Sequence, residues 1–212
     1  MPLSLRPGTL ADVKRMADIY FDAFSTNTMN ARVFPKSLPE SHVFWEKNIA
    51  DGFKDTYSNF VLMVDDDTQE TVAFAIWGSP RLPTDTTPSM PPVDTFPAGG
   101  DRDNARVFFS DLEQQHKRFM TADDGSHIPH WYLELIATHK DHQGKGAASA
   151  LLRWGEQRAD ADQVPCYLDA TPDGRPVYTS KSHGFREVDA RTYMGGEYEH
   201  VFMIRDPKPV AK

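Results

Sequence analysis

The chain has 212 residues, with 23 Lys and Arg against 31 Asp and Glu, which gives a net charge of −8. Its length suits one large domain or two small ones, and its 39% of hydrophobic residues supply a packed core and exclude a wholly disordered chain. A general nucleic-acid binder needs a basic surface, so the acidic balance argues against nucleic acid as a partner. It favours cationic or amine-bearing small molecules.

The single cysteine, Cys166, excludes an internal disulfide and a zinc site built from cysteines. The first residues carry no apolar stretch long enough for a signal peptide, and no apolar run approaches the roughly 18–20 residues that span a bilayer. The longest run, Val72–Trp77, has the length of a buried strand. We therefore expect a cytoplasmic protein without a membrane partner, present as a monomer or a homodimer.

The first half of the chain predicts a strand, two helices and a strand hairpin. Thr9 stands where an N-cap would, with Asp12 three residues later, and apolar residues follow at helical spacing. The charged linker 65–69 joins two apolar strands and indicates a hairpin. In chain order, the expected elements are a strand at 3–6, a helix at 9–24, a polar, turn-rich stretch at 25–39, a helix at 40–53, strands at 59–64 and 71–77, and a helix at 105–120.

Residues 80–104 differ from the rest of the chain in composition, with six prolines and the pair Gly99-Gly100. No helical or strand period survives there, and loops of this length inside a domain are often functional. We expect this segment to be an excursion from the core. No repeat or linker divides the chain, so the sequence predicts a single domain over residues 1–212.

The second half alternates strands with helices. A strand, a helix and a further strand follow one another over 131–169 with short connections, which implies a right-handed crossover and a partly parallel sheet. The fold class is therefore α/β. The expected elements are strands at 131–137, 165–169, 184–188 and 198–205, and helices at 145–159 and 175–182.

The segment 133–152 combines a buried strand, a polar turn and a glycine-rich helix start. Gly144 and Gly146 lack a Cβ, so a ligand can approach the backbone closely, and Lys140 and Lys145 supply positive charge. Backbone N–H groups at a helix N-terminus, aided by the helix dipole, bind phosphate. The segment predicts an anion site, with a well-capped helix start as the simpler alternative.

Two other nucleotide-binding motifs fit this segment less well. A P-loop requires Gly-x-x-x-x-Gly-Lys followed by Ser or Thr, whereas Lys145 is followed by glycine. A Rossmann fingerprint is closer, with Gly144-x-Gly146-x-x-Ser149 and Asp169 after the next strand. However, mostly polar residues separate the first strand from the first glycine. A nicotinamide-dependent oxidoreductase remains an alternative at this point.

The run Gln143–Ala148 resembles the [Arg/Gln]-x-x-Gly-x-[Gly/Ala] motif of the GCN5-related N-acetyltransferase (GNAT) superfamily, through Gln143, Gly146 and Ala148. The resemblance extends to 167–178 and to His183-Gly184-Phe185, a pattern common in small-molecule members from fungi. It is strong over 131–187 and topological over 1–79.

This resemblance implies a single GNAT-like domain, whose central, mixed, mostly antiparallel sheet splays between its fourth and fifth strands and is flanked by helices. It implies acetyl-CoA as a co-substrate lying between those strands. Main-chain groups of Ile136, Ala137 and Thr138 would pair with the pantetheine, and backbone amides after the strand would hold the pyrophosphate. The residues expected to supply those amides are Gln143, Gly144, Lys145, Gly146, Ala147 and Ala148.

Acetyl transfer to an amine needs a neutral amine, a polarised thioester carbonyl and a proton for the departing thiolate. Glu134 is the candidate base, because it alternates with Tyr132 and Ile136 on one face of an apolar strand, where burial would raise its pKa. Many relatives use a glutamate of the fourth strand in this role. A structural carboxylate paired with an Arg or His is the alternative.

Tyr178 is the candidate acid, because many relatives place a tyrosine near the CoA sulfur on this short helix. A core aromatic is the alternative. The asparagine that relatives often carry before this helix is not evident, and Thr171 or Asp173 stands there instead. His139 and His142 lie at i, i+3 spacing, but no third ligand is evident nearby, so we expect no metal.

The predicted function is transfer of an acetyl group from acetyl-CoA to a primary amine of a small molecule by direct attack. A non-catalytic acyl-CoA-binding or regulatory module on the same fold is the alternative. By topology, segments 9–24, 25–38 and 80–104 should flank the opening for the amine.

Overall fold

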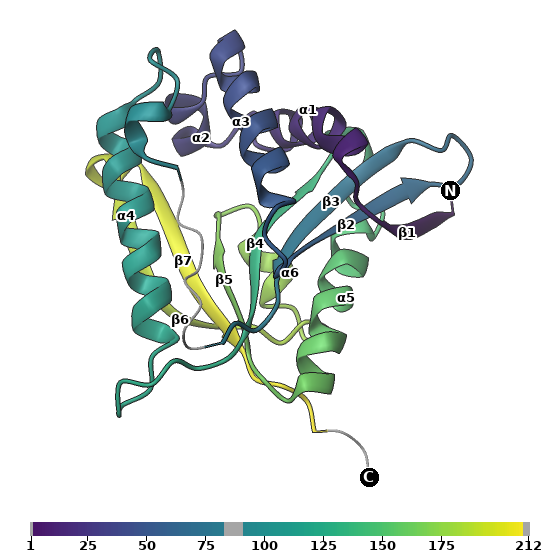
Figure 1. Cartoon of the computed structure of the whole chain (residues 1–212), viewed down its shortest axis with the longest axis vertical. Coiled ribbons are helices and arrows are strands. Elements are labelled where there is room, and N and C mark those ends of the chain that lie inside the picture. The colour runs from purple at the N-terminus through teal and green to yellow at the C-terminus, as the bar shows by residue number, and fades with distance from the viewer. Residues whose placement is uncertain (1, 83–90, 210–212) are drawn as a thin grey trace.

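The computed structural model describes residues 2–82 and 91–209. The strands are β1 (Leu3–Pro7), β2 (Ser58–Asp65), β3 (Thr71–Gly78), β4 (Trp131–Thr138), β5 (Cys166–Ala170), β6 (Arg186–Tyr193) and β7 (Tyr198–Arg205). Within the described residues they form one seven-stranded sheet in the order β1-β2-β3-β4-β5-β7-β6 (Figure 1). Neighbouring strands are antiparallel except β4 and β5, which are parallel.

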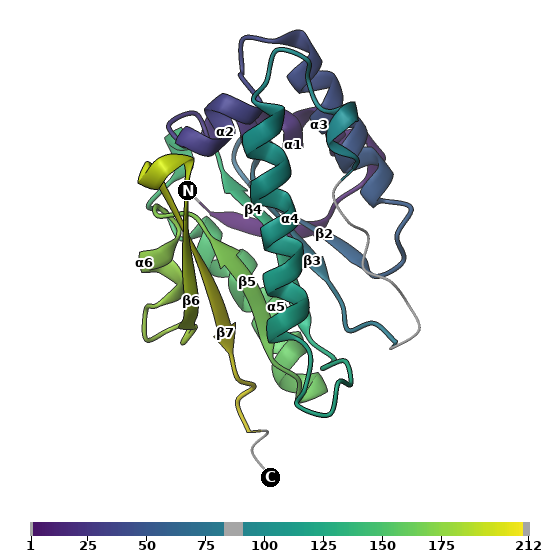
Figure 2. The same ribbon diagram turned by 90° about the vertical axis from the view of Figure 1, so that its left-hand side faces the viewer.

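Helices cover both faces of this sheet. They are α1 (Val13–Ala23), α2 (Thr28–Val33), α3 (Pro39–Gly52), α4 (Arg102–Phe119), α5 (Ala147–Asp162) and α6 (Arg175–Tyr178). Helices α1 to α4 share one hydrophobic cluster with the sheet, and α5 and α6 share another. Figure 2 shows β6 and β7 between α4 and α6, which therefore lie on opposite faces of the sheet. We call these the α4 face and the α5 face, since α5 and α6 share one cluster.

The packing of α5 depends on one glycine. A Cβ at Gly155 would lie 2.3 Å from the ring of Trp77 on β3, so only glycine allows the helix to approach this closely. The indole Nε1 of Trp77 donates a hydrogen bond to the carbonyl of Leu151 in α5 at 3.2 Å. These contacts fix the start of α5 relative to the central strands.

Three expected elements differ from the structure. The stretch 25–39 contains α2, which begins because the side chain of Asn27 accepts a hydrogen bond from the amide of Asn30 at 2.9 Å. Strand β6 continues to Tyr193, well beyond the expected 184–188, because its polar residues pair with β7. Helix α6 ends at Tyr178 instead of 182.

The proline-rich segment 80–104 is only in part an excursion. Its residues 83–90 lie outside the described residues, so the expectation is not assessed there. Phe96, however, is 2% exposed and packs against Phe34, Phe44 and Phe109. The end of the segment therefore belongs to the core. Within the described ranges, no helix is long and apolar enough to cross a membrane.

Strands β4 and β5 separate part-way along their length. Their ladder runs from Trp131 opposite Cys166 to Leu133 opposite Leu168 and stops, although β4 continues to Thr138. We call the region beyond Leu133 and Leu168 the fork. It is the splay between the fourth and fifth strands that the family resemblance implies.

Candidate active site

Glu134 lies at a β-bulge at the start of the fork. In the ladder with β3, Ile76 is opposite Leu135 and Trp77 is opposite Leu133, so Glu134 is an extra residue of β4. A bulge re-aims one side chain and changes which face the following residues occupy. Glu134 is also the first residue of β4 beyond its last pair with β5.

The expected alternation of Glu134 with Tyr132 and Ile136 on one strand face is therefore wrong. Tyr132 packs in a cluster on the α4 face, whereas Ile136 packs with α5 on the opposite face. Glu134 stays with Tyr132, since both line a cavity of about 10 Å³ together with His116 of α4. That volume is close to the space of one water molecule.

The surroundings of Glu134 raise its pKa to about 7. Burial is the largest cause; the positive charge of Arg81 lowers the pKa and the negative charge of Asp55 raises it. Arg81 itself forms an ion pair with Asp55 and lies 4.6 Å from the centre of the Tyr57 ring. A carboxyl group with this pKa can accept a proton at neutral pH.

Two histidines near Glu134 are held neutral. Burial is the main cause that lowers the pKa of His116 to about 3 and that of His130 to about 4. The Nδ1 of His130 lies 2.7 Å from the carbonyl of Ile128 and must donate to it, so its Nε2 is an acceptor. His116 then donates from its Nε2 to the Nε2 of His130 at 2.6 Å. The sequence analysis did not single out either residue.

Tyr178 lies on the other side of the sheet. It is buried in the cluster on the α5 face, and its ring packs against Phe185 and against the Cα of Gly174, where a Cβ would come within 2.8 Å. Burial and, second, the charge of Asp169 raise its pKa, so the phenol is protonated at neutral pH. Glu134 and Tyr178 thus occupy opposite faces of the sheet near the fork.

A chain of hydrogen bonds ends at Asp169, the first residue of β5 beyond the last pair with β4. Its carboxylate accepts from the hydroxyl of Tyr132 at 3.0 Å and from Nε2 of His200 at 2.9 Å. The Nδ1 of His200 is 3.0 Å from the hydroxyl of Tyr198, and the amide of Asn27 donates to that hydroxyl at 3.3 Å. The β5–β7 register brings Asp169 and His200 together, which no local sequence signal reveals.

The glycine-rich turn after β4 has the backbone that the anion-site prediction requires. Gly144 and Gly146 have φ angles of +72° and +85°, and Gly146 is the N-cap of α5. A Cβ at either position would have no described atom within 4 Å, so the space above the turn is open. The side chain of Gln143 folds back and donates to the carbonyl of Thr138 at 3.2 Å.

The other residues expected in this turn surround that space. The ammonium group of Lys145 donates to the carbonyl of Asp141 at 2.7 Å, which keeps its positive charge beside the turn. Ala147 is buried under the first turn of α5, and Ala148 is half-buried. The first amides of α5 have no acceptor within the helix, and such amides at a helix N-terminus can bind an anion.

The end of β4 offers its free edge to the fork. Ile136, Ala137 and Thr138 pair with β3 on one side, whereas the ladder with β5 has already stopped on the other. The buried hydroxyl of Thr138 has no hydrogen-bond partner among the described residues. A free strand edge that leads to an open glycine turn fits an extended ligand with an anionic end.

Asp22 of α1 fastens the turn to the rest of the domain. Its carboxylate accepts from the amide of Lys140 at 2.8 Å and lies 3.3 Å from the ammonium group of the same lysine. His139 is 3.7 Å away. Burial raises the pKa of Asp22, but the bonds from Lys140 outweigh it and the net shift is downward.

A second buried chain supports the first turn of α5. The hydroxyl of Ser149 lies 3.0 Å from Nε2 of His183, and Nδ1 of His183 lies 2.6 Å from the carboxylate of Glu156. The side chain of His183 is 1% exposed. This chain joins the segment His183-Gly184-Phe185 to the helix that begins at the glycine turn.

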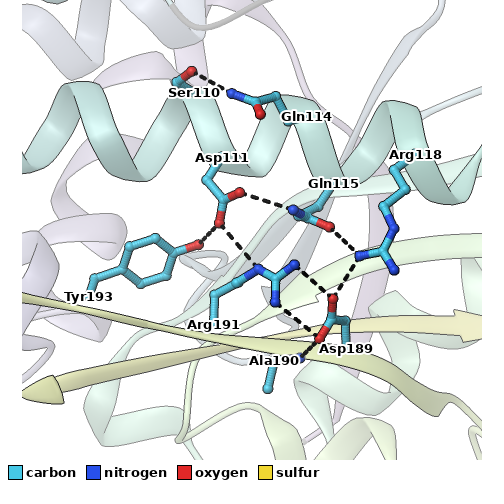
Figure 3. Close-up of polar contacts among 9 residues, drawn as sticks. All are labelled: Ser110, Asp111, Gln114, Gln115, Arg118, Asp189, Ala190, Arg191 and Tyr193. Carbon is cyan, nitrogen blue, oxygen red and sulfur yellow. Dashed lines mark hydrogen bonds and ion pairs between the residues drawn. The ribbon is translucent and has the colours of Figure 1, made fainter.

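A depression with a volume of about 490 Å³ lies between α4 and β6. Polar and charged side chains of the two elements form a network there (Figure 3). Asp111 accepts from Tyr193 at 2.7 Å and from Gln115 at 3.0 Å, and Asp189 accepts from Arg118 at 2.8 Å. We call this group the α4–β6 network; it consists of Asp111, Gln115, Arg118, Asp189, Arg191 and Tyr193.

The rings of His139 and His142 are 5.9 Å apart, centre to centre. In the parts of the chain that the structure describes, no group of three or more His, Cys, Asp or Glu side chains is placed to hold a metal ion.

Solved structures with this fold come from proteins of different activities. A Corynebacterium glutamicum protein described as histone acetyltransferase HPA2 and related acetyltransferase has a TM-score of 0.66 and 22% identity, over 100% of both chains. The ribosomal-protein-S18-alanine N-acetyltransferase of Escherichia coli has a TM-score of 0.53 and 14% identity, over 100% of this chain and 97% of that one. The C-terminal condensation domain of Ebony, in complex with beta-alanyl-dopamine, has a TM-score of 0.66 and 10% identity, over 97% and 99%. At these identities the likeness concerns the fold.

The model of the acetyltransferase (GNAT) family matches residues 26–185, which include the fork, the glycine turn and α6. The match agrees with the seven-stranded sheet and with its parallel pair β4–β5. It argues against a nicotinamide-dependent oxidoreductase, because the glycine turn lies within the part of the chain that matches the acetyltransferase family. The chain therefore belongs to the acetyltransferase (GNAT) family, whose fold supports acyl transfer.

Proposed function

We propose that this protein is an N-acetyltransferase that moves an acetyl group from acetyl-CoA to a primary amine of a small molecule, by direct attack of the amine on the thioester. One observation carries the proposal. At the fork, a carboxyl group with a pKa of about 7 lies on one face of the sheet and a protonated phenol lies on the other. The resemblance of 167–178 and 183–185 to small-molecule members from fungi is consistent with such an acceptor.

Glu134 is the proposed base. With a pKa of about 7, its carboxyl group is about half ionised at neutral pH, so it can take a proton from the attacking nitrogen at physiological pH. The bulge directs its side chain to the α4 face, beside a cavity with room for about one water molecule, which can relay that proton. The alternative, in which Glu134 is a structural carboxylate paired with an arginine, is less well supported because Arg81 forms its ion pair with Asp55.

Tyr178 is the proposed acid. Its raised pKa keeps the proton on the phenol until a stronger base, the departing thiolate, forms nearby. It shares the hydrophobic cluster of the α5 face with Ala147, at the start of the helix that follows the glycine turn, which suits a thioester that enters along β4 from that turn. The amine and its base would then approach from the α4 face.

Acetyl-CoA would be held by backbone groups. The free edge of Ile136, Ala137 and Thr138 suits the amides of an extended pantetheine, and the unpartnered hydroxyl of Thr138 suits a polar group of the same ligand. The amides from Gln143 to Ala148 suit the pyrophosphate, since the two glycines leave the space above them open.

The proposal can be tested by a panel of primary amines with acetyl-CoA, with release of free thiol and the mass of each product as readouts. Thiol release that requires the amine, with a mass gain of one acetyl group on the amine, supports it. Tight CoA binding with no thiol release from any amine would favour the non-catalytic acyl-CoA-binding or regulatory module. The fold does not decide the acceptor, since its solved relatives include an enzyme named for a ribosomal protein.

A further inference from the structure

Asp169 and Glu134 stand at the start of the fork, one on each strand. Leu133 and Leu168 form the last pair between β4 and β5, so Glu134 and Asp169 are the next residues on the two strands. Both carboxylates act on the phenol of Tyr132, whose pKa is raised well above its ordinary value by burial first and then by charges that include theirs. The two acids therefore lie around one phenol on the α4 face.

The donors around Asp169 have a fixed direction. The side-chain oxygen of Asn27 accepts from the amide of Asn30, so its NH₂ group is the one that meets the hydroxyl of Tyr198. An ionised carboxylate only accepts, so His200 donates to Asp169 from Nε2, and its Nδ1 lies 3.0 Å from the hydroxyl of Tyr198. The hydroxyl of Tyr132 and the ring of His200 therefore both donate to Asp169.

This arrangement leaves Asp169 with unused acceptor sites. A carboxylate offers about four lone-pair sites, and only Tyr132 and His200 donate to this one among the described residues. Among the described residues the ion-pair contact of Asp169 is with His200, at 2.9 Å, and no lysine or arginine pairs with it. Its side chain is 14% exposed, so a ligand can reach it. A carboxylate that is mostly buried and keeps unused acceptor sites is available to a cation.

The groups around this carboxylate indicate the chemistry of the rest of the ligand. The ring of Phe108 packs edge-on against His200 and Tyr198, at 5.1 and 5.9 Å between ring centres. The hydroxyl of Tyr167, fully buried on the same face, has no hydrogen-bond partner among the described residues. Aromatic rings and one unpartnered hydroxyl suit a compact ligand with an apolar ring and a positive charge.

We propose that Asp169 binds the ammonium group of the acceptor, and that the acceptor is a primary amine with an aromatic or similarly apolar body. This inference rests on the proposed function and names its substrate class. The ammonium group binds Asp169 as a cation and then transfers one proton from nitrogen to Glu134. The neutral amine that results keeps its lone pair for attack, while Asp169 and its donors stay unchanged.

Calorimetric titration in the presence of CoA tests this assignment, with 2-phenylethylamine as the cationic probe and 2-phenylethanol as its uncharged counterpart. We expect the native protein to bind the amine more tightly than the alcohol. Asp169→Asn should weaken binding of the amine at least about tenfold, the range of a charge-assisted hydrogen bond, and change binding of the alcohol less than about twofold. Asp189→Asn, which removes the same charge from the α4–β6 network, is the matched control and should change neither.

Three outcomes would overturn the assignment. They are a native protein that does not prefer the amine, an Asp169→Asn variant that binds the amine normally, and an equal loss for both probes. Asp169→Glu keeps the charge and should keep the preference, which guards against a variant that fails to fold. Turnover is scored separately: a native protein that binds the amine through Asp169 but releases no thiol would refute the acetyltransferase proposal and leave the amine site standing.

Discussion

Helix α4 borders two polar regions of opposite character. On one side it forms the α4–β6 network, in which carboxylates meet guanidinium groups and the side chains of Arg118 and Arg191 are 57% and 40% exposed (Figure 3). On the other side its residues cover the fork, where the side chains of His200 and Asp169 are 4% and 14% exposed. At the fork the carboxylate of Asp169 meets the hydroxyl of Tyr132 and the ring of His200 instead.

The difference separates a connecting role from a chemical one. Exposed ion pairs contribute little to stability, because water and salt screen them, and their charges are already paired. The carboxylates of the fork are largely buried, which is costly for the fold and useful for a reaction. We therefore expect substitutions at the fork to change activity and substitutions in the network to change stability slightly.

The largest effect is expected for Glu134→Gln. The variant keeps shape and hydrogen bonding but cannot accept a proton, so turnover near pH 7 should fall about 10²-fold or more. Native activity should decrease as the pH drops below about 7, where Glu134 becomes protonated. In the variant this limb of the pH–rate profile should vanish, and a profile identical to the native one would assign Glu134 a structural role.

The same variant should be more stable at alkaline pH. Since folding raises the pKa of Glu134 to about 7, the native fold loses stability as the pH rises from the unfolded value through that point. Glu134→Gln removes this loss, so its melting temperature should exceed the native one at pH 8 and match it near pH 4. The gain is about 1–2 kcal/mol, because a group that touches a cavity is partly solvated.

The next largest effect is expected for His200→Leu, which breaks the chain that ends at Asp169. It removes the ring nitrogen that lies 3.0 Å from the hydroxyl of Tyr198 and one donor from a buried carboxylate, at a cost of about 2 kcal/mol in unfolding free energy. His200→Gln can accept from Tyr198 and donate to Asp169, and should recover part of that loss in a denaturant titration. Equal losses in both variants would mean that ring packing, not the hydrogen bonds, holds the region.

Gly146→Asn tests whether the exposed glycine turn takes part in the reaction, as the fork does, or serves only the fold, as the network does. Asparagine tolerates the positive φ of +85°, but its side chain fills the open space over the amides, so CoA should bind about tenfold more weakly. Gly125→Asn is the control, because Gly125 has a φ of +83° and equally open surroundings in the loop 120–130. Equal CoA affinity in both variants would remove the turn from the cofactor site.

Tyr178→Phe removes a single oxygen from the α5 face of the fork. If the phenol protonates the thiolate, kcat should fall about tenfold while KM for acetyl-CoA and the melting temperature stay nearly constant. A core tyrosine would instead lose thermal stability without a kinetic change. Steady-state kinetics and a melting curve on one preparation separate the two roles.

The sequence predicted more of the fold than of the geometry of the candidate site. Strand β7 was expected at 198–205 and lies there, because its apolar side chains pack in the core on both faces. The glycine-rich turn was expected before a helix, and its glycines adopt the positive φ that glycine tolerates. The bulge at Glu134 could not be predicted, since nothing in β4 marks which residue is extra. The place of His116 beside the same cavity as Glu134 depends on the packing of α4, which follows a segment without periodicity.

The smallest effect is expected for Tyr193→Phe, which tests the network itself. The variant removes the hydroxyl that donates to Asp111 at 2.7 Å and keeps the ring against Phe108. Asp111 retains Gln115 and is close to water, so the loss in unfolding free energy should stay below about 1 kcal/mol. Turnover should be unchanged, because the hydroxyl contacts no residue of the fork.

Adding salt provides the control for this last variant. Native protein and Tyr193→Phe should both lose a few tenths of a kcal/mol as ionic strength rises and the ion pairs of Arg118 and Arg191 are screened. A tenfold loss of turnover in Tyr193→Phe would contradict the separation of the two regions. It would mean that the network sets the position of α4, and that His116 transmits that position to Glu134.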